Sequence, residues 1–225
     1  MILKPPKGAM LNRGHPYARG LVGLWLMNEG GGNTVADLSG NGGAGSLNGD
    51  VNWVGGKYGP ALNFLGDADY VSAETPPGFT DEITIIVSFR ADVVEEMVLI
   101  KIADAMLKLD NGGDIQWWPN VGTTVVDYAA GYVANRTYTI AITHDRNNIY
   151  KWYVDGVLGK TDTTTQVAVD LVSPDKVIIG NYNGAGGLWD FDGIIDYLPI
   201  YNRALPATDI MNLYRSPFCM FEVDL

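Results

Sequence analysis

Cysteine, histidine and basic side chains are all scarce in this sequence. Its 225 residues include one cysteine, Cys219, and two histidines. A single cysteine excludes an internal disulfide framework and a cysteine-based zinc site. Lysine and arginine number 15 against 26 acids, which leaves a net charge of −11. Because no basic stripe is present to neutralise phosphates, the composition argues against nucleic-acid binding.

Long hydrophobic runs are missing as well. No stretch of about 18 apolar residues is present, so we expect no membrane insertion. The residues that follow Met1 are polar and rich in proline, which is unlike a secretion signal. If the protein acts outside a cell, we therefore expect it to leave the cell by a route other than signal-directed secretion.

Glycine, tyrosine and tryptophan are abundant instead, with 28, 12 and 6 residues. Segments such as 83–90 and 138–143 alternate between apolar and polar residues, as half-buried strands do. About a dozen such short segments follow one another at intervals of about 8–12 residues, separated by turn residues such as Asp155 and Gly156. This spacing predicts an all-β protein, either an antiparallel β-sandwich or a jelly roll, and not alternating strands and helices.

The chain divides into one domain with two short terminal segments. Residues 1–19 predict an N-terminal arm, residues 20–215 the domain, and residues 216–225 a C-terminal tail. Residues 206–214 have a helical pattern, so one short C-terminal helix is expected. Residues 53–60 are rich in turn residues and are expected to link two strands. The arm is expected to lie either on its own domain or on a neighbouring subunit.

The last predicted strand carries an acid on its apolar face. Ile194, Asp196, Leu198 and Ile200 alternate onto one side, so a carboxylate lies in line with three aliphatic side chains. A buried carboxylate needs a cation or several hydrogen-bond donors beside it. The identity of that partner is the main question that this segment raises.

The opposite face of the same strand carries Tyr197, Pro199 and Tyr201. An exposed patch of this kind is typical of contact with another protein. We assign Phe218 of the tail to the same candidate interface. Packing of a terminal segment against these residues is an equally weighted alternative.

Several short motifs occur in an order and spacing that resemble a known family. In chain order they occupy residues 20–25, 28–30, 37–41, 59–64, 67–71, 153–156, 179–180, 195–196 and 201–205. Together they resemble the laminin-G-like, concanavalin-A-like jelly-roll family, over about residues 20–215. The arm and the closing tail resemble flanks seen on phage and viral members. The resemblance implies two antiparallel sheets packed face to face.

The resemblance also implies a structural calcium ion near one rim of the sandwich. The ligand positions of the family fall here on Asp37, Asn41 and Asp196. Calcium takes about 6–8 oxygen ligands, and glycine-rich loops let backbone carbonyls converge on it. The alternative is that Asp37 caps its own turn and Asp196 accepts backbone N–H groups.

Aromatic residues are the best candidates for a ligand site. Sugar-binding sandwiches stack sugar rings on tryptophan and tyrosine, with polar side chains beside them for the hydroxyl groups. The candidates here are Trp117, Trp118, Tyr182, Asn183 and Trp189. Trp117 and Trp118 are neighbours in a strand and point to opposite faces, so at least one of them lies outside the core.

Catalysis finds less support. The same sandwich carries glycoside hydrolases and lyases, so the fold does not decide the matter. Retaining glycosidases of this fold use a Glu-x-Asp-x-x-Glu strand, which is missing from a chain with six glutamates. His144 ends a predicted strand without a second positioned group. We therefore expect a protein that is not an enzyme.

The sequence thus favours a non-catalytic binding or structural module. The preferred hypothesis is a surface protein of a phage or viral particle, either a capsid decoration or a tail-associated protein, that also binds carbohydrate. A free lectin-like module is the alternative, and a polysaccharide-cleaving enzyme ranks last. The expected partners are other virion proteins, a second copy of the chain, or glycans, and the expected location is the virion surface or the extracellular space.

Overall fold

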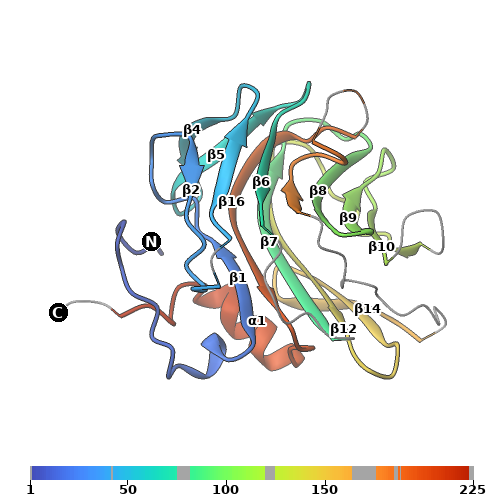
Figure 1. Cartoon of the computed structure of the whole chain (residues 1–225). Helices are drawn as coiled ribbons and strands as arrows, with labels where there is room; N and C mark the ends of the chain where they lie inside the picture. The colour runs from blue at the N-terminus through green and yellow to red at the C-terminus, as the bar shows by residue number, and fades with distance from the viewer. Residues whose placement is uncertain are drawn as a thin grey trace.

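Two antiparallel sheets packed face to face form the body of the molecule (Figure 1). The structure is a computed structural model, and it describes residues 2–41, 43–74, 82–119, 125–163, 176–184, 187 and 189–222. The predicted antiparallel sandwich is confirmed. None of the helices within these ranges is long and apolar enough to cross a membrane.

The first sheet has eight strands, and its central strand β16 pairs with three others. Across the sheet the order is β14, β13, β12, β7, β16, β5 and β4, and β1 also pairs with β16. The bounds are β14 Val157–Asp162, β13 Tyr150–Val154, β12 Thr137–His144, β7 Ile83–Ala91, β16 Asp192–Tyr201, β5 Gly59–Leu65, β4 Asn52–Gly56 and β1 Leu21–Trp25. The last strand of the chain therefore lies beside the first one.

The second sheet also has eight strands, in the order β11, β10, β9, β8, β15, β6, β3 and β2. The bounds are β11 Val126–Tyr128, β10 Ile115–Trp118, β9 Ala105–Leu109, β8 Met97–Ile102, β15 Val177–Ile179, β6 Tyr70–Ala73, β3 Gly45–Asn48 and β2 Thr34–Val35. Its strands β8, β9 and β10 are joined in sequence, and together they present one continuous outer face.

The central core fills the space between the two sheets. Alternate residues of each strand point into it, as the pleat requires. Its largest side chains include Trp25, Phe64, Phe89, Trp117 and Trp152, all 0% exposed. Aromatic rings of this size bury enough apolar area to make this layer the main source of stability.

One segment of the fold differs from the sequence-based expectation. Residues 53–60 are not a turn-rich link, because most of them belong to the hairpin of β4 and β5, in which Gly56 pairs with Gly59. The glycines weakened the strand pattern in the sequence. Gly59 has a φ of 124°, a conformation that favours glycine, so its place next to the hairpin tip accounts for its presence.

Two helices are described, the 3-10 helix η1 (Pro16–Ala18) and the α-helix α1 (Ala207–Arg215). The short C-terminal helix expected at 206–214 is confirmed, with Pro206 at its N-cap position. Ile210 and Leu213 are its buried side chains. They belong to a second apolar cluster, which lies on the outer face of the first sheet.

This second cluster is the outer cluster, and the terminal segments of the chain contribute much of it. Its buried members are Leu21, Leu24, Leu26, Tyr58, Ile86, Ala141, Tyr153, Tyr197, Tyr201, Leu205, Ile210, Leu213, Phe218, Met220 and Phe221. The arm and the tail also bond to each other, since the amide of Asn12 donates to the carbonyl of Met220 at 2.8 Å and Leu11 forms a β-bridge with Phe221. The first sheet is therefore covered on both faces.

Candidate functional site

Three aromatic side chains gather on the outer face of the second sheet. Trp118 comes from β10, whereas Tyr182 and Trp189 come from the segment between β15 and β16. The ring centroids of Trp118 and Trp189 lie 5.9 Å apart, and those of Tyr182 and Trp189 lie 5.2 Å apart. All three side chains are half-buried. We call these three residues the aromatic surface.

The strand pleat separates Trp117 from Trp118. Trp117 and Ile115 point into the central core, and Trp117 is 0% exposed. The prediction that Trp117 binds a ligand is therefore wrong, because its indole is part of the core. The prediction that at least one of the tryptophan pair lies outside the core is confirmed by Trp118.

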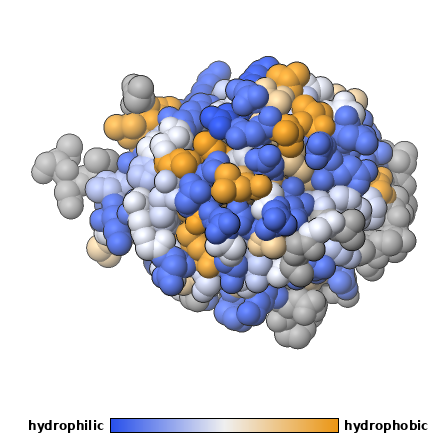
Figure 2. Space-filling model, turned by 90° about the horizontal axis from the view of Figure 1, so that it is seen from above, coloured by the Kyte–Doolittle hydropathy of each residue, from blue (hydrophilic) through white to orange (hydrophobic). Residues whose placement is uncertain are grey.

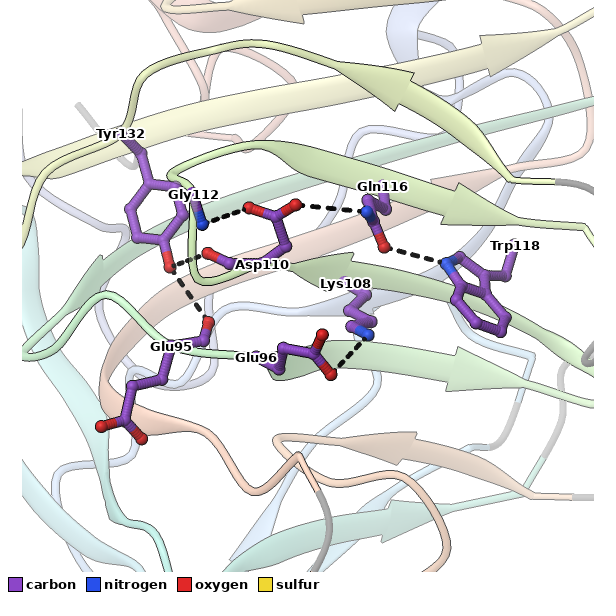
Figure 3. Close-up of polar contacts among 8 residues, drawn as sticks. All are labelled: Glu95, Glu96, Lys108, Asp110, Gly112, Gln116, Trp118 and Tyr132. Atoms are coloured by element: carbon purple, nitrogen blue, oxygen red, sulfur yellow. Dashed lines mark hydrogen bonds and ion pairs between the residues drawn. The ribbon is translucent and has the colours of Figure 1, made fainter.

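Trp118 is held in place by a chain of hydrogen bonds (Figure 3). Its Nε1–H donates to Oε1 of Gln116 at 3.1 Å, and Nε2 of Gln116 donates to Oδ2 of Asp110 at 3.3 Å. The other oxygen of Asp110 accepts the amides of Gly112 at 2.7 Å and Asp114 at 2.9 Å. Because the carboxylate is fixed by the hairpin turn, the orientation of the indole follows from the turn.

A lysine lies against both tryptophans. Nζ of Lys108 lies 4.0 Å from the ring centroid of Trp189 and 5.1 Å from that of Trp118. It also forms an ion pair of 3.0 Å with Glu96, as Figure 3 shows. The Lys108 side chain is only 3% exposed. Cation–π contact and the ion pair together offset the cost of placing this ammonium out of water.

The segment that carries Trp189 is tied to the second sheet and to the loop between β5 and β6. The amide of Val98 donates to the carbonyl of Trp189 at 2.8 Å. The carboxylate of Asp190 accepts the amide of Ala68 at 3.1 Å and also binds the side chain of Asn181. Trp189 itself has a φ of 60°, a rare conformation for a large side chain that persists where the surroundings impose it.

Next to Trp189 the surface is hollowed. The hollow measures about 410 Å³, and its lining includes Asp67, Glu95, Glu96, Asp190 and Asp192. Burial raises the pKa of Asp192, and the nearby carboxylates of Asp92 and Glu95 raise it further.

Seen from above, the molecule shows mostly hydrophilic residues with separate small groups of hydrophobic ones among them (Figure 2).

Asn183 is exposed, and its backbone amide donates to Oδ1 of Asn181 at 2.9 Å. The other polar side chains of the site were missed by reasoning from the sequence. Lys101 lies over the ring of Tyr182 at 5.8 Å, and Lys108 pairs with Glu96. The sequence does single out these two lysines, since Lys101 in β8 and Lys108 in β9 each interrupt a strand that is otherwise apolar.

The residues expected to bind calcium have other partners. Oδ1 of Asp37 accepts the amides of Leu24 and Ser39, at 2.8 and 2.9 Å, and its Oδ2 accepts the hydroxyl of Ser39 at 2.8 Å. Nδ2 of Asn41 donates to the carbonyl of Val22 at 2.9 Å. The loop thus covers the edge of β1 that β16 leaves unpaired, which is a common way to protect a strand edge.

Asp196 is paired with the arm and the β4–β5 hairpin. It lies where the register of β16 against β7 shifts between Ile195 and Tyr197, and it is 1% exposed. Its Oδ1 accepts the amide of Lys57 at 2.8 Å. Burial raises the pKa of Asp196, and the charge of Lys4 opposes that rise.

Lys4 is the buried cation that faces this carboxylate. Its Nζ donates to the carbonyls of Met27, at 3.3 Å, and Pro60. Burial lowers the pKa of Lys4 to about 8, against the opposing charges of Asp196 and Glu29. Lys4 is thus one source of the positive charge that Asp196 needs, and Lys57 is a second.

These contacts do not fit a shared calcium site. Asp37 and Asp196 each accept donors from the chain, and Asp196 also faces an ammonium group. Among the residues that the structure describes, no group of three or more His, Cys, Asp or Glu side chains is arranged to hold a metal ion. Calcium stays a prediction from the resemblance.

The candidate interface residues lie inside the chain. Tyr197 is 3% exposed and Tyr201 is 0% exposed, and Pro199 is also buried. The ring of Tyr197 packs edge-on against Phe218 at 5.4 Å and Tyr58 at 5.6 Å. The expectation of an exposed patch is therefore wrong, because the tail and α1 cover it. The alternative, packing of a terminal segment, is what the structure shows.

The chain belongs to the concanavalin A-like lectin/glucanases superfamily, because the laminin G-type model of that family matches residues 65–211. No curated protein sequence matches the chain significantly. Family membership agrees with the sandwich fold and with the resemblance of its motifs.

Solved structures show the same fold at low sequence identity. The binding domain of Paraclostridial Mosquitocidal Protein 1 has a TM-score of 0.71 at 18% identity, over 90% of this chain and 53% of that chain. The ligand binding domain of botulinum neurotoxin serotype D, in complex with N-acetylneuraminic acid, has a TM-score of 0.70 at 15% identity, over 88% and 51%. This chain therefore spans about half the length of these toxin structures.

A third similar structure is close to this chain in size. Domain 4 of AbnA, an extracellular arabinanase from Geobacillus stearothermophilus, was solved in complex with arabinotriose. It has a TM-score of 0.71 at 17% identity, over 86% of this chain and 98% of that domain. At these identities the likeness shows the fold alone.

Proposed function

We propose that this protein is a non-catalytic carbohydrate-binding domain that holds a sugar against the aromatic surface. The observation that carries the proposal is the gathering of three half-buried rings, from two segments of the chain, on the outer face of one sheet. Aromatic rings stack against the apolar faces of sugar rings, and carboxylates beside them accept hydrogen bonds from hydroxyl groups.

The fixed orientation of the rings supports the proposal. Trp118 is held through Gln116 and Asp110. The backbone of Trp189 is bound by the amide of Val98, and its ring contacts Lys108. A platform that is already ordered loses little entropy when a ligand binds. Two of the similar structures are complexes with sugars, namely N-acetylneuraminic acid and arabinotriose, which adds support from the fold family.

The absence of catalysis is part of the proposal. His144, the histidine of β12, is 0% exposed and stacks on Tyr150 with ring centroids 4.3 Å apart. Its imidazole is therefore out of reach of a sugar bound on either outer face. A general acid or base must lie within hydrogen-bond reach of the reacting atoms.

A glycan array followed by titration tests this function. We expect reproducible binding to a set of oligosaccharides, and we expect Trp118→Ala to weaken that binding by about 10- to 100-fold, since one stacked ring contributes about 1–3 kcal/mol. Trp53→Phe is the matched control, because Trp53 is also half-buried but lies in the first sheet. Equal loss of binding in both variants would contradict the assignment of the site.

A structural role on a phage or viral particle is the second candidate. It is favoured by exposed apolar side chains on the arm, where Ile2, Leu3 and Met10 are 43%, 61% and 71% exposed. Leu3 and Met10 border a hollow of about 440 Å³ between the arm and the tail, together with Phe218 and Phe221. Apolar surface of this kind is common where proteins assemble.

Light scattering coupled to size-exclusion chromatography distinguishes the two candidates. An oligomer that dissociates in the double variant Leu3→Ser, Met10→Ser and that binds no glycan supports the structural role. A monomer with reproducible glycan binding supports the carbohydrate-binding domain.

A further inference from the structure

The cationic group nearest the two tryptophans is already bound within the chain. Nζ of Lys108 lies against the indoles of Trp118 and Trp189 and 3.0 Å from Glu96. With 3% of its side chain exposed, Lys108 is enclosed, whereas 44% of the Glu96 side chain is exposed. An incoming carboxylate or sulfate therefore meets the carboxylate of Glu96 before it meets the ammonium of Lys108.

The surroundings of the aromatic surface are strongly acidic. Five carboxylates line the hollow beside Trp189, namely Asp67, Glu95, Glu96, Asp190 and Asp192. A second lysine, Lys101, lies over Tyr182 and is outnumbered by these carboxylates. Like charges within about 8–10 Å of each other repel at physiological ionic strength. The raised pKa of Asp192 has the same cause, after burial.

Building on the function proposed above, we propose that the aromatic surface selects neutral glycans and excludes glycans that carry carboxylate or sulfate groups. The ion pair of Glu96 with Lys108 is the element that sets this selectivity. A neutral sugar donates its hydroxyl hydrogens to the carboxylates around Trp189 and stacks its apolar face on the rings. An anionic sugar brings a further negative charge to a site whose nearest cation, Lys108, is already paired with Glu96.

The test compares matched pairs of probes on one array. Lactose is printed beside 3′-sialyllactose and sulfated lactose, and neutral arabinan, xylan and galactan oligosaccharides beside oligogalacturonate. We expect binding in the neutral set, with each anionic counterpart weaker by about tenfold or more, the effect of one unfavourable charge contact. Higher salt should reduce the difference in affinity between the neutral and the anionic probes.

Two outcomes overturn the proposal and are distinct from each other. Equal or tighter binding of the anionic probes removes the inference and leaves the carbohydrate-binding function in place. Failure of every probe to bind, neutral or anionic, removes the proposed function and the inference with it.

Glu96→Gln tests the role of the ion pair itself. The substitution frees the ammonium of Lys108, so the ratio of anionic to neutral binding should rise by about tenfold. Glu82→Gln is the matched control. Glu82 directly precedes β7 of the first sheet, and it pairs with the exposed Arg146 at 3.6 Å. An unchanged ratio in Glu96→Gln, with thermal melts showing both variants folded, rules out this ion pair as the selective element.

Discussion

The outer faces of the two sheets carry similar side chains but have different surroundings. On the first sheet Tyr197 and Tyr201 point outward and are covered by α1, the arm and the tail. On the second sheet Trp118 and Trp189 point outward and stay half-buried, with Lys108 against both rings. Outward aromatic residues therefore contribute to stability on one face and form the proposed binding surface on the other, and the terminal segments make the difference.

The covered face should be the more sensitive to loss of an aromatic ring. Tyr201→Ala removes a fully buried ring from the outer cluster and should lower the free energy of unfolding by about 3–5 kcal/mol. Trp189→Ala removes a half-buried ring and should cost about 1 kcal/mol, the common value for a substitution outside a core. Urea denaturation of the two variants measures the contrast.

Tyr201→Phe is the control for that comparison. The Tyr201 hydroxyl is buried and makes no hydrogen bond, so its removal should leave stability unchanged or slightly higher. If Tyr201→Ala and Trp189→Ala prove equally destabilising, the distinction between a covered and an open face fails.

The contribution of the arm to stability should depend on the buried ammonium of Lys4. Lys4→Met removes a buried charge that favours the ionised form of Asp196 and also the donor to two backbone carbonyls, while the charge of Lys57 stays nearby. It should lower the free energy of unfolding by about 1–3 kcal/mol. Lys7→Met, an exposed lysine of the same arm, should have no effect. The double variant Lys4→Met, Asp196→Asn should recover part of the loss, because the unpaired charge is gone. A denaturation series with Lys4→Met, Asp196→Asn and the double variant closes the cycle and gives the coupling energy.

The titration of Lys4 should also affect the pH dependence of stability. Burial lowers the pKa of Lys4 to about 8 from 10.5, so between these values the unfolded chain binds more protons than the folded one. Stability contributed by this group therefore rises with pH across this window, by at most about 3 kcal/mol. The advantage of the wild type over Lys4→Met should grow from pH 8 to pH 10.5. A constant difference would show that Lys4 titrates normally in the folded state.

A smaller effect is expected on the open face. Gln116→Leu removes the acceptor for the Trp118 indole and the donor to Asp110, while the strand position stays filled. Binding of a neutral glycan should weaken by about fivefold, since one net hydrogen bond contributes about 1 kcal/mol. Stability should change little, because Gln116 is half-buried. Titration calorimetry with the best array hit measures the loss, and unaltered affinity would separate Gln116 from the site.

Reasoning from the sequence succeeded where the cause was local. The alternation of residues 83–90 predicted most of β7, and adjacent Trp117 and Trp118 had to point to opposite faces. The need of Asp196 for a partner also followed from its place on an apolar strand face. These inferences use only neighbours along the chain, where the geometry of one strand sets the answer.

Reasoning from the sequence failed where the cause was distant. Lys4 reaches Asp196 from the other end of the chain, and the register shift at Ile195 and Tyr197 depends on pairing with β7. The tail covers Tyr197 through Phe218, which no periodicity can show. The sequence grouped Tyr197, Pro199, Tyr201 and Phe218 correctly, but it could not tell a neighbouring molecule from the protein's own tail.

The smallest effect should come from removal of metal ions. The carboxylate of Asp37 accepts four hydrogen bonds from its own chain, and that of Asp196 accepts the amide of Lys57 and lies within the field of the Lys4 charge. A structural ion contributes to stability only if the folded state binds it. We therefore expect the melting temperature to stay the same in excess EDTA and after addition of calcium. A rise with calcium that is lost in Asp37→Asn but kept in Lys4→Met would place an ion at the loop that follows β2, and would mean that this loop exchanges its hydrogen bonds for a metal when one is present.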